Sequence, residues 1–207
     1  EVIGEASDGE ECLQKLEKVK PDVLLLDINM PKMNGLELLE KLQKNRIEQT
    51  VIVVSTVAKE GAKETIKALE LGAFDFVTKP ENYLETKGET FKNNIHKMLD
   101  LATGSHRSKV DLRTTSFAKQ GSVVRPAKPK PVVMPRKLEP GNFTGVKTGR
   151  KKIVALACST GGPKSLQQVI PYLPKNLDAP VVLVQHMPAG FTFSLSQRLN
   201  EISEVEV

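Results

Sequence analysis

Residues 22–31 read DVLLLDINMP, an apolar strand pattern that stops at a carboxylate and turns at a proline. A second apolar run follows at residues 51–54 and a short strand pattern, FDFV, at 74–77, and each is separated from the next by a segment with helical periodicity. Continuous apolar strands that alternate with amphipathic helices are typical of a parallel sheet covered on both faces. The stretch therefore predicts an α/β fold.

The same alternation extends outward in both directions and returns near the end of the chain. We expect an earlier strand over residues 2–6 and later strands over 153–157 and 181–185. Helices are expected over residues 10–19, 36–43, 62–71 and 91–102, from about 163, and from about 193.

The middle of the chain has a different composition. Residues 103–150 contain five prolines and carry a net charge of +9, whereas residues 1–102 carry −5 and residues 151–207 carry +1. Such a stretch, without sustained periodicity, cannot bury enough apolar surface to offset its ordering entropy. We therefore predict a folded domain over residues 1–102, a flexible basic linker over 103–150, and part of a second parallel α/β domain over 151–207.

Composition also argues against several classes of protein. Aromatic residues make up 4% of the chain and Trp is absent, which disfavours a stacking surface for single-stranded nucleic acid. The excess positive charge lies in the linker rather than on a folded face, so we expect no nucleic-acid partner. No apolar run approaches a membrane span, and Cys12 and Cys158 fit no disulfide or metal pattern; we also expect no signal peptide. A cytoplasmic protein without membrane insertion is expected.

Polar side chains follow three of the predicted strands. Asp27 follows the first quoted run, Ser55 and Thr56 follow the second, and Lys79 follows the third. Because parallel strands end at a common edge, these groups can converge there, where the carboxylate could accept a phosphoryl group. Mg²⁺ would then be needed, with Asp27 and the backbone carbonyl of Asn29 as ligands. Taken singly, Asp27 could instead cap a loop and Lys79 could form an ordinary ion pair.

Two motifs in this part of the chain, residues 22–35 and 72–80, resemble those of response-regulator receiver domains. The resemblance implies a flavodoxin-like, doubly wound parallel sheet over residues 1–102, and we expect this receiver to lack the family's first strand and helix. It also implies that Asp27 is the phosphoacceptor, that Ser55 or the adjacent Thr56 is the switch hydroxyl, and that Lys79 is the family's lysine. The family's acidic pair at the end of its first strand has no match here, so we expect this chain to bind metal weakly.

A second set of chemical groups follows the two strands near the end of the chain. Ser159 comes after one strand at the start of a helix, where backbone N–H groups favour a developing oxyanion, and His186 comes after the next strand. Gly161 and Gly162 allow close backbone approach. The pattern predicts a serine–histidine nucleophile and base, although a phosphate-binding turn is an alternative. Cys158 is expected to be a small buried residue rather than the nucleophile.

Residues 157–163 and 184–192 resemble the methylesterase domain of CheB-type chemotaxis proteins, which combine a receiver, a linker and a methylesterase in this order. The resemblance implies that Ser159 is the nucleophile, that His186 is its base, and that Thr160 shapes the active-site turn. The family completes the triad with a downstream aspartate, which none of Glu201, Glu204 and Glu206 matches. We expect that aspartate beyond Val207, and little esterase activity from this chain alone.

The family implies a chemotaxis response regulator that hydrolyses glutamate methyl esters on the cytoplasmic domains of chemoreceptors and also deamidates glutamines. A chemotaxis histidine kinase would phosphorylate Asp27 with Mg²⁺, whereas the esterase chemistry would need no cofactor. The unphosphorylated receiver would cover the esterase site. The alternative is a receiver-containing transcriptional regulator or a non-enzymatic signalling adaptor.

Overall fold

The computed structural model describes residues 1–80, 88–104 and 152–207. Three parallel strands form the sheet of the N-terminal unit (residues 1–80 and 88–104), in the order β1 (Leu24–Asp27), β2 (Val51–Ser55), β3 (Asp75–Thr78). Asp27 lies beside Val54, and Ser55 lies beside Thr78. The predicted parallel α/β fold is confirmed. Because the three strands are parallel, their carboxyl ends lie at one edge of the sheet.

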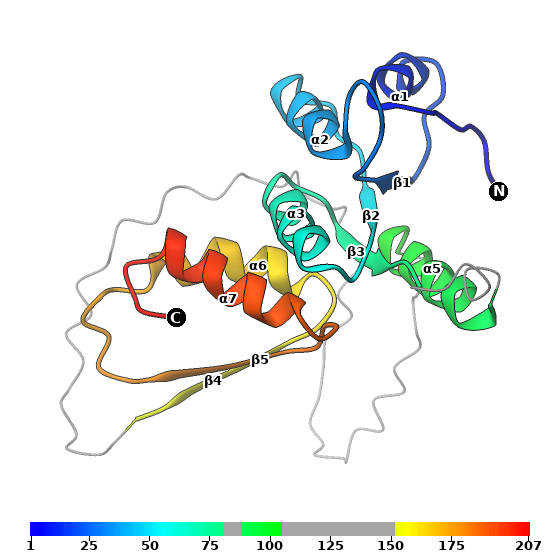
Figure 1. Cartoon of the computed structure of the whole chain (residues 1–207). Coiled ribbons are helices and arrows are strands. Elements are labelled where there is room, and N and C mark those ends of the chain that lie inside the picture. The colour runs from blue at the N-terminus through cyan, green and yellow to red at the C-terminus, as the bar shows by residue number, and fades with distance from the viewer. Residues whose placement is uncertain (81–87, 105–151) are drawn as a thin grey trace, which may run out of the picture.

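Helices α1 (Gly9–Leu16), α2 (Gly35–Lys44) and α3 (Lys59–Glu70) pack in succession, and α5 (Glu89–Ala102) contacts β3 (Figure 1). A capping box of Asn34 and Glu37 starts α2. A Cβ on Gly35 would lie 2.6 Å from the carbonyl oxygen of Asp27. Glycine at this position therefore lets α2 begin directly against the end of β1.

The C-terminal unit (residues 152–207) is a two-stranded parallel sheet with its helices on one side. Strands β4 (Val154–Cys158) and β5 (Val181–Gln185) pair in register, and the helical segments are α6 (Gly162–Val169), η1 (Ile170–Tyr172) and α7 (Phe191–Ile202). Helices α6 and α7 lie between this sheet and α3 (Figure 1). The opposite face of this sheet exposes Val182 and Val184, and the predicted βα units of a second parallel α/β domain are confirmed.

The strand predicted over residues 2–6 is also wrong. Residues 1–6 have no regular structure, and no described strand lies alongside them to complete a ladder. A parallel strand gains its backbone hydrogen bonds only from a neighbouring strand, so an apolar pattern alone does not form one.

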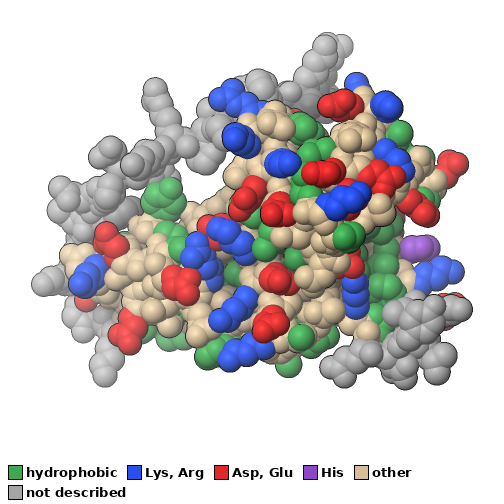
Figure 2. Space-filling view, turned by 45° about the horizontal axis from the view of Figure 1, so that its top comes forward, with side chains coloured by type: hydrophobic (Ala, Val, Ile, Leu, Met, Phe, Trp, Pro, Cys, Tyr) green, Lys and Arg blue, Asp and Glu red, His purple; other side chains and the backbone are tan. Residues whose placement is uncertain are grey.

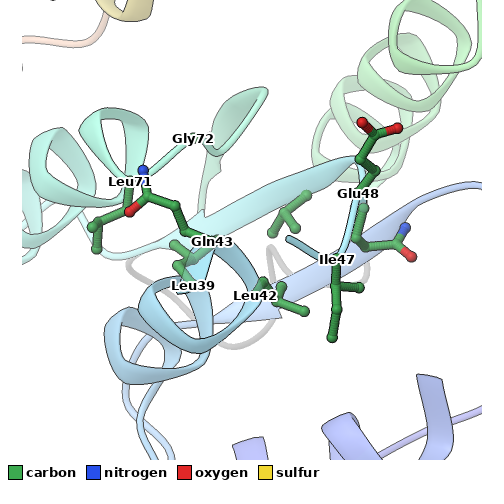
Figure 3. A pocket seen from close by; sticks show the side chains of 9 residues that line it. Leu39, Leu42, Gln43, Ile47, Glu48, Leu71 and Gly72 are labelled. Atoms are coloured by element: carbon green, nitrogen blue, oxygen red, sulfur yellow. The ribbon is translucent and has the colours of Figure 1, made fainter. Parts of the chain in front are cut away.

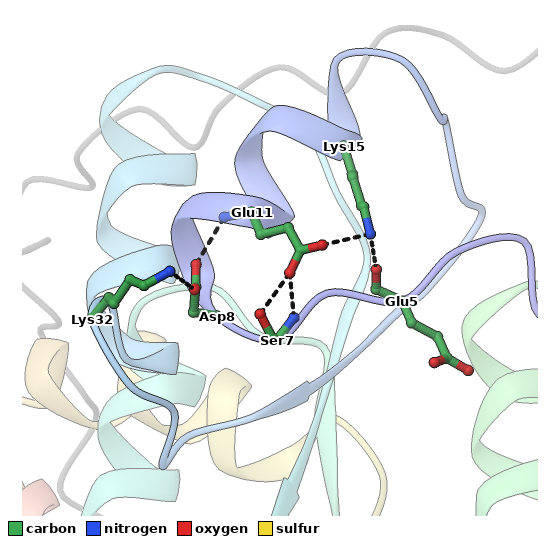
Figure 4. Close-up of polar contacts among 6 residues, drawn as sticks. All are labelled: Glu5, Ser7, Asp8, Glu11, Lys15 and Lys32. Carbon is green, nitrogen blue, oxygen red and sulfur yellow. Dashed lines mark hydrogen bonds and ion pairs between the residues drawn. The ribbon is translucent and has the colours of Figure 1, made fainter.

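Residues 5–7 are instead bound to side chains of α1, Ser7 to Glu11 and the carbonyl of Glu5 to Lys15 in its last turn (Figure 4). The carboxylate of Glu11 accepts hydrogen bonds from the backbone N–H (2.8 Å) and the hydroxyl (2.7 Å) of Ser7, and it pairs with Lys15 at 2.7 Å. The hydrogen bond from Lys15, with smaller contributions from the two Ser7 donors, lowers the pKa of Glu11 to about 2. The buried Asp8 caps the helix through the N–H of Glu11 and pairs with Lys32 at 2.8 Å.

The predicted linker lies almost wholly outside the described residues. None of the described helices is long and apolar enough to cross a membrane. Of the predicted domain over residues 1–102, the described part ends with α5 at Ala102.

The two units share one hydrophobic core. Buried residues of α3 and β3 belong to the same cluster as Leu166 of α6 and Leu195 and Leu199 of α7. At its centre the ring of Phe76 stacks on that of Phe191, with centroids 4.8 Å apart, and Phe191 is fully buried. Aromatic pairs of this kind stabilise by more than their buried area alone.

We expect Phe191→Ala to lower the free energy of unfolding by about 3–5 kcal/mol, because it leaves a cavity and removes the stacked ring. Phe193→Ala is the matched control, since Phe193 lies on the same helix with 56% of its surface exposed, and should change stability by about 0.5 kcal/mol or less. Urea unfolding of the two variants measures the difference. Equal losses would show that the units do not share this core in solution.

Candidate functional site

The edge where β1 and β3 end brings together two of the predicted residues. The Lys79 ammonium forms an ion pair with the Asp27 carboxylate, and both side chains are partly exposed. The backbone N–H of Lys79 also donates to the carbonyl of Ser55 at 2.6 Å. A lysine held against an exposed carboxylate can neutralise negative charge added to that carboxylate.

The hydroxyl of Ser55 has different partners. Ser55 is buried, and its Oγ accepts a hydrogen bond from Thr65 at 2.6 Å and donates to the carbonyl of Gly61 at 3.2 Å. Thr56 is exposed and lies over Gly61. Among the described residues, neither hydroxyl is hydrogen-bonded to Asp27. The predicted switch residues therefore share the edge with Asp27, but the Ser55 hydroxyl is directed toward α3.

Thr65 is a partner that sequence reasoning missed. It lies on the buried face of α3, one turn before Leu69 and three residues after Ala62. A single polar residue within a helical apolar stripe was the available signal, because a buried hydroxyl must find a hydrogen-bond partner.

One of the two predicted magnesium ligands, the carboxylate of Asp27, lies partly exposed at this edge. The backbone N–H of Asn29 donates weakly to Asp27 Oδ1 at 3.4 Å. The described residues contain no group of three or more His, Cys, Asp or Glu side chains that could hold a metal ion. Mg²⁺ commonly keeps several waters and binds through one or two carboxylates together with phosphate oxygens, so a single carboxylate and a carbonyl supply an incomplete set.

Ser159 and His186 lie at the corresponding edge of the second sheet. Cys158 pairs with Gln185, so the two candidate residues directly follow paired positions on β4 and β5. The backbone N–H of His186 donates to the carbonyl of Cys158 at 3.0 Å. Both side chains are exposed, and no hydrogen bond joins the hydroxyl to the imidazole among the described residues. Topology thus brings them to neighbouring positions with free side chains.

The turn after Ser159 has the geometry that its glycines predict. Gly161 precedes α6 with φ of +71°, a left-handed conformation that glycine adopts readily. Gly162 begins α6, and its N–H donates to the carbonyl of Ser159 at 2.8 Å. Thr160, between them, is exposed.

A carboxylate from the N-terminal unit binds this turn. The backbone N–H of Gly161 donates to Asp75 Oδ2 at 2.8 Å, while the other Asp75 oxygen accepts from the N–H of Phe76 at 2.9 Å. Asp75 is 5% exposed, and burial raises the pKa of its carboxyl. Sequence reasoning had quoted this residue within a motif without assigning it a role, although an acid at the start of an apolar strand was a visible signal.

Two further polar contacts surround this bond. Lys164 donates to the carbonyl of Gly72 at 2.9 Å, and burial lowers its pKa. Arg198 binds both carboxylate oxygens of Glu70, at 2.9 and 3.1 Å. Over the face shown in Figure 2, acidic and basic side chains are interspersed rather than gathered by sign. Within the described residues, one ion pair, that of Arg198 with Glu70, thus connects α3 to the C-terminal unit.

The described surface also has a small apolar hollow far from these edges (Figure 3). It has a volume of about 210 Å³ and includes Val51, at the opposite end of β2 from Ser55. Its lining is Leu39, Leu42, Gln43, Ile47, Glu48, Gln49, Val51, Leu71 and Gly72. None of the predicted site residues lies in it.

Comparison with known proteins adds to this geometry. Residues 2–87 match the response regulator receiver domain, and residues 154–207 match the CheB methylesterase. The protein-glutamate methylesterase/protein-glutamine glutaminase of Bacillus subtilis is 43% identical over the whole of this chain and 54% of its own length, and that of Archaeoglobus fulgidus has the same identity and coverage. The chain therefore spans about half the length of these curated relatives.

Solved structures include the response regulator domain of Thermotoga maritima CheB. It is 39% identical, with a TM-score of 0.41, and the match covers 50% of this chain and 75% of that one.

Proposed function

The chain belongs to the CheB family of response regulators, and we propose that it is part of an enzyme that hydrolyses glutamate methyl esters on chemoreceptors. Glutamine deamidation is proposed as a second reaction of the same site, following the name of the relatives. The observation that carries the proposal is the placement of Ser159 and His186 at one edge of paired parallel strands. A transcriptional regulator is disfavoured because both residues lie on βα units that match the methylesterase.

The proposed reaction is acyl transfer. His186 removes the proton from Ser159 as the hydroxyl attacks the ester carbonyl, and the imidazolium then protonates the leaving methoxide to give methanol. Water, deprotonated by the same imidazole, cleaves the acyl-serine and releases glutamate. The imidazole also needs an orienting carboxylate, and none of the described acids is hydrogen-bonded to it.

We propose that the domains follow one another along the chain in the order found in the family. We assign residues 1–102 to a receiver, 103–150 to a linker and 151–207 to the methylesterase. A chemotaxis histidine kinase is the proposed phosphodonor, and the cytoplasm is the proposed location, where the receptors' methylated domains are accessible. The esterase chemistry described above uses only protein side chains and water.

We propose that Asp27 accepts the phosphoryl group, with Lys79 beside it and Mg²⁺ bound by Asp27 and the carbonyl of Asn29. Held by these two groups, Mg²⁺ would supply positive charge that offsets the charge of the phosphodonor. Ser55, or Thr56, then becomes the hydroxyl that binds a phosphoryl oxygen. For Ser55 this requires its hydroxyl to leave Thr65 and Gly61, which links phosphorylation to α3.

Asp27→Asn should abolish labelling of the full-length protein by radioactive acetyl phosphate with Mg²⁺, because the amide cannot form an acyl phosphate. Asp22→Asn removes a nearby exposed carboxylate and should leave the labelling unchanged. Autoradiography of the purified proteins measures this. Undiminished label in the Asp27 variant would remove that residue as the acceptor.

Ser159→Ala should lower methanol release from methylated receptors by about 1,000-fold or more in the full-length protein, because the nucleophile is lost. Ser196→Ala, on α7, should retain the wild-type rate, since its hydroxyl only caps the carbonyl of Phe193. Turnover that persists in the Ser159 variant would contradict the proposed mechanism.

Control by the receiver is proposed to run through the contact of Asp75 with the turn. Asp75→Ala removes an acceptor from the N–H of Gly161, and such charge-assisted bonds contribute roughly 1.5–3 kcal/mol. We expect the unphosphorylated full-length variant to show roughly 10-fold or more higher esterase activity, and a smaller further gain on phosphorylation.

Asp75→Asn is the intermediate variant, because its one amide oxygen can accept from the N–H of Gly161 while its NH₂ group then faces the N–H of Phe76; it should raise basal activity less than Asp75→Ala does. Methanol release with and without acetyl phosphate compares the three proteins. Equal basal rates in wild type and Asp75→Ala would show that this bond does not restrain the site.

A further inference from the structure

Gln185, the last residue of β5, has a side chain that reaches both candidate catalytic residues. Its Nε2 donates to the carbonyl oxygen of Ser159 at 2.9 Å and to the carbonyl oxygen of His186 at 3.0 Å. One amide group therefore binds the backbone of the proposed nucleophile and of the proposed base at the same time.

These bonds add to other backbone hydrogen bonds made by the segments that follow β4 and β5. The Ser159 carbonyl also accepts from the N–H of Gly162, and the N–H of His186 donates to Cys158. For the carbonyl of His186, Gln185 is the one donor recorded within the described parts of the chain. Without the amide, the two segments would be joined here only through the contact of His186 with Cys158.

The surroundings of the amide oxygen, Oε1, define the orientation of the Gln185 amide. Oε1 of Gln185 is buried and has no hydrogen-bond partner among the described residues. A Cβ on Gly162 would lie 2.1 Å from this oxygen, so the amide fits only against a glycine. Turning the amide over would place Oε1 against two carbonyl oxygens, and no hydrogen bond can form there because none of these oxygens carries a hydrogen. The NH₂ group must therefore face Ser159 and His186.

We propose that Gln185 is a positioning residue for the Ser159–His186 pair, an inference that rests on the proposed esterase function. Because the hydroxyl and imidazole are not bonded to each other here, their approach in the reaction depends on where the backbone holds them. Fixing both carbonyls sets the separation of the two Cα atoms and leaves both side chains free to rotate. Reactions between held groups lose rate steeply when the geometry shifts by about 1 Å.

Gln185→Glu in the full-length protein keeps the size of the side chain but replaces the donor with oxygens that face two carbonyls. We expect kcat for methanol release to fall roughly 10- to 100-fold while KM changes less than about threefold, because substrate contacts remain. The rate at which a phosphonofluoridate labels Ser159 should fall by a similar factor. This second readout reports the serine–histidine geometry without the receptor substrate.

Gln167→Glu is the matched control. Gln167 is a buried glutamine on α6 that donates only to the carbonyl of Pro163 and also carries an unpaired oxygen. It should lose stability to a similar extent and keep wild-type kcat and labelling rate. Gln185→Asn, which keeps an amide too short to reach both carbonyls, should lower kcat as well, and it carries the test if the Glu variant does not fold.

The outcomes separate this inference from the proposed function. Wild-type kcat and labelling rate in a folded Gln185 variant, or equal losses in the Gln167 control, would overturn the positioning role while leaving the esterase intact. Slower labelling in the Gln185 variants, in a protein whose wild type releases no methanol from receptors, would support the positioning role and overturn the proposed substrate.

Discussion

The hydrogen bond from the Gly161 N–H to the Asp75 carboxylate binds the turn after Ser159 to the N-terminal unit, beside the hydrophobic core that the two units share. A buried carboxylate without a cation is unfavourable unless N–H groups replace its lost water, and here the donors are Gly161 and Phe76. The N-terminal end of α6 adds a favourable field. The stacked rings of Phe76 and Phe191 lie beside it and exclude solvent. The strand that carries Lys79 is thereby bound to the turn that carries Ser159.

This arrangement gives a physical route between two distant chemical groups. Lys79, which pairs with Asp27, lies four residues after Asp75, and its N–H is bonded to the carbonyl of Ser55. The hydroxyl of Ser55 is bonded in turn to Thr65 of α3, the helix that packs on α6 and α7. A change at Asp27 that redirects the Ser55 hydroxyl would disturb α3 and β3. These two elements contact α6 and the turn after Ser159. Each step of this route is a contact between described residues.

Much of this could be predicted from residues close together in the sequence. The runs at 22–27 and 51–55 indicated parallel strands. A strand with apolar side chains on both faces must be covered on both faces, which is typical of parallel sheets. Their polar ends indicated a common edge, and Asp27 and Lys79 meet there. The strand predicted over residues 2–6 did not form, because its apolar pattern was right but strand formation also needs a neighbour. The direction of the Ser55 hydroxyl depended on Thr65, ten residues later, and could not be found from the apolar run at 51–54 that precedes Ser55.

The sequence by itself therefore determined the α/β class, the strand ends that carry Asp27, Lys79, Ser159 and His186, and the glycine turn before α6. Periodicity and local backbone preference encode these features within a few residues. Only the tertiary structure decided that Asp75 binds Gly161, that Gln185 bridges Ser159 and His186, and that Phe76 stacks on Phe191. These contacts join residues that are 86, 26 and 115 positions apart. Which partner a buried polar or aromatic group finds across such a separation depends on packing, which no local pattern records.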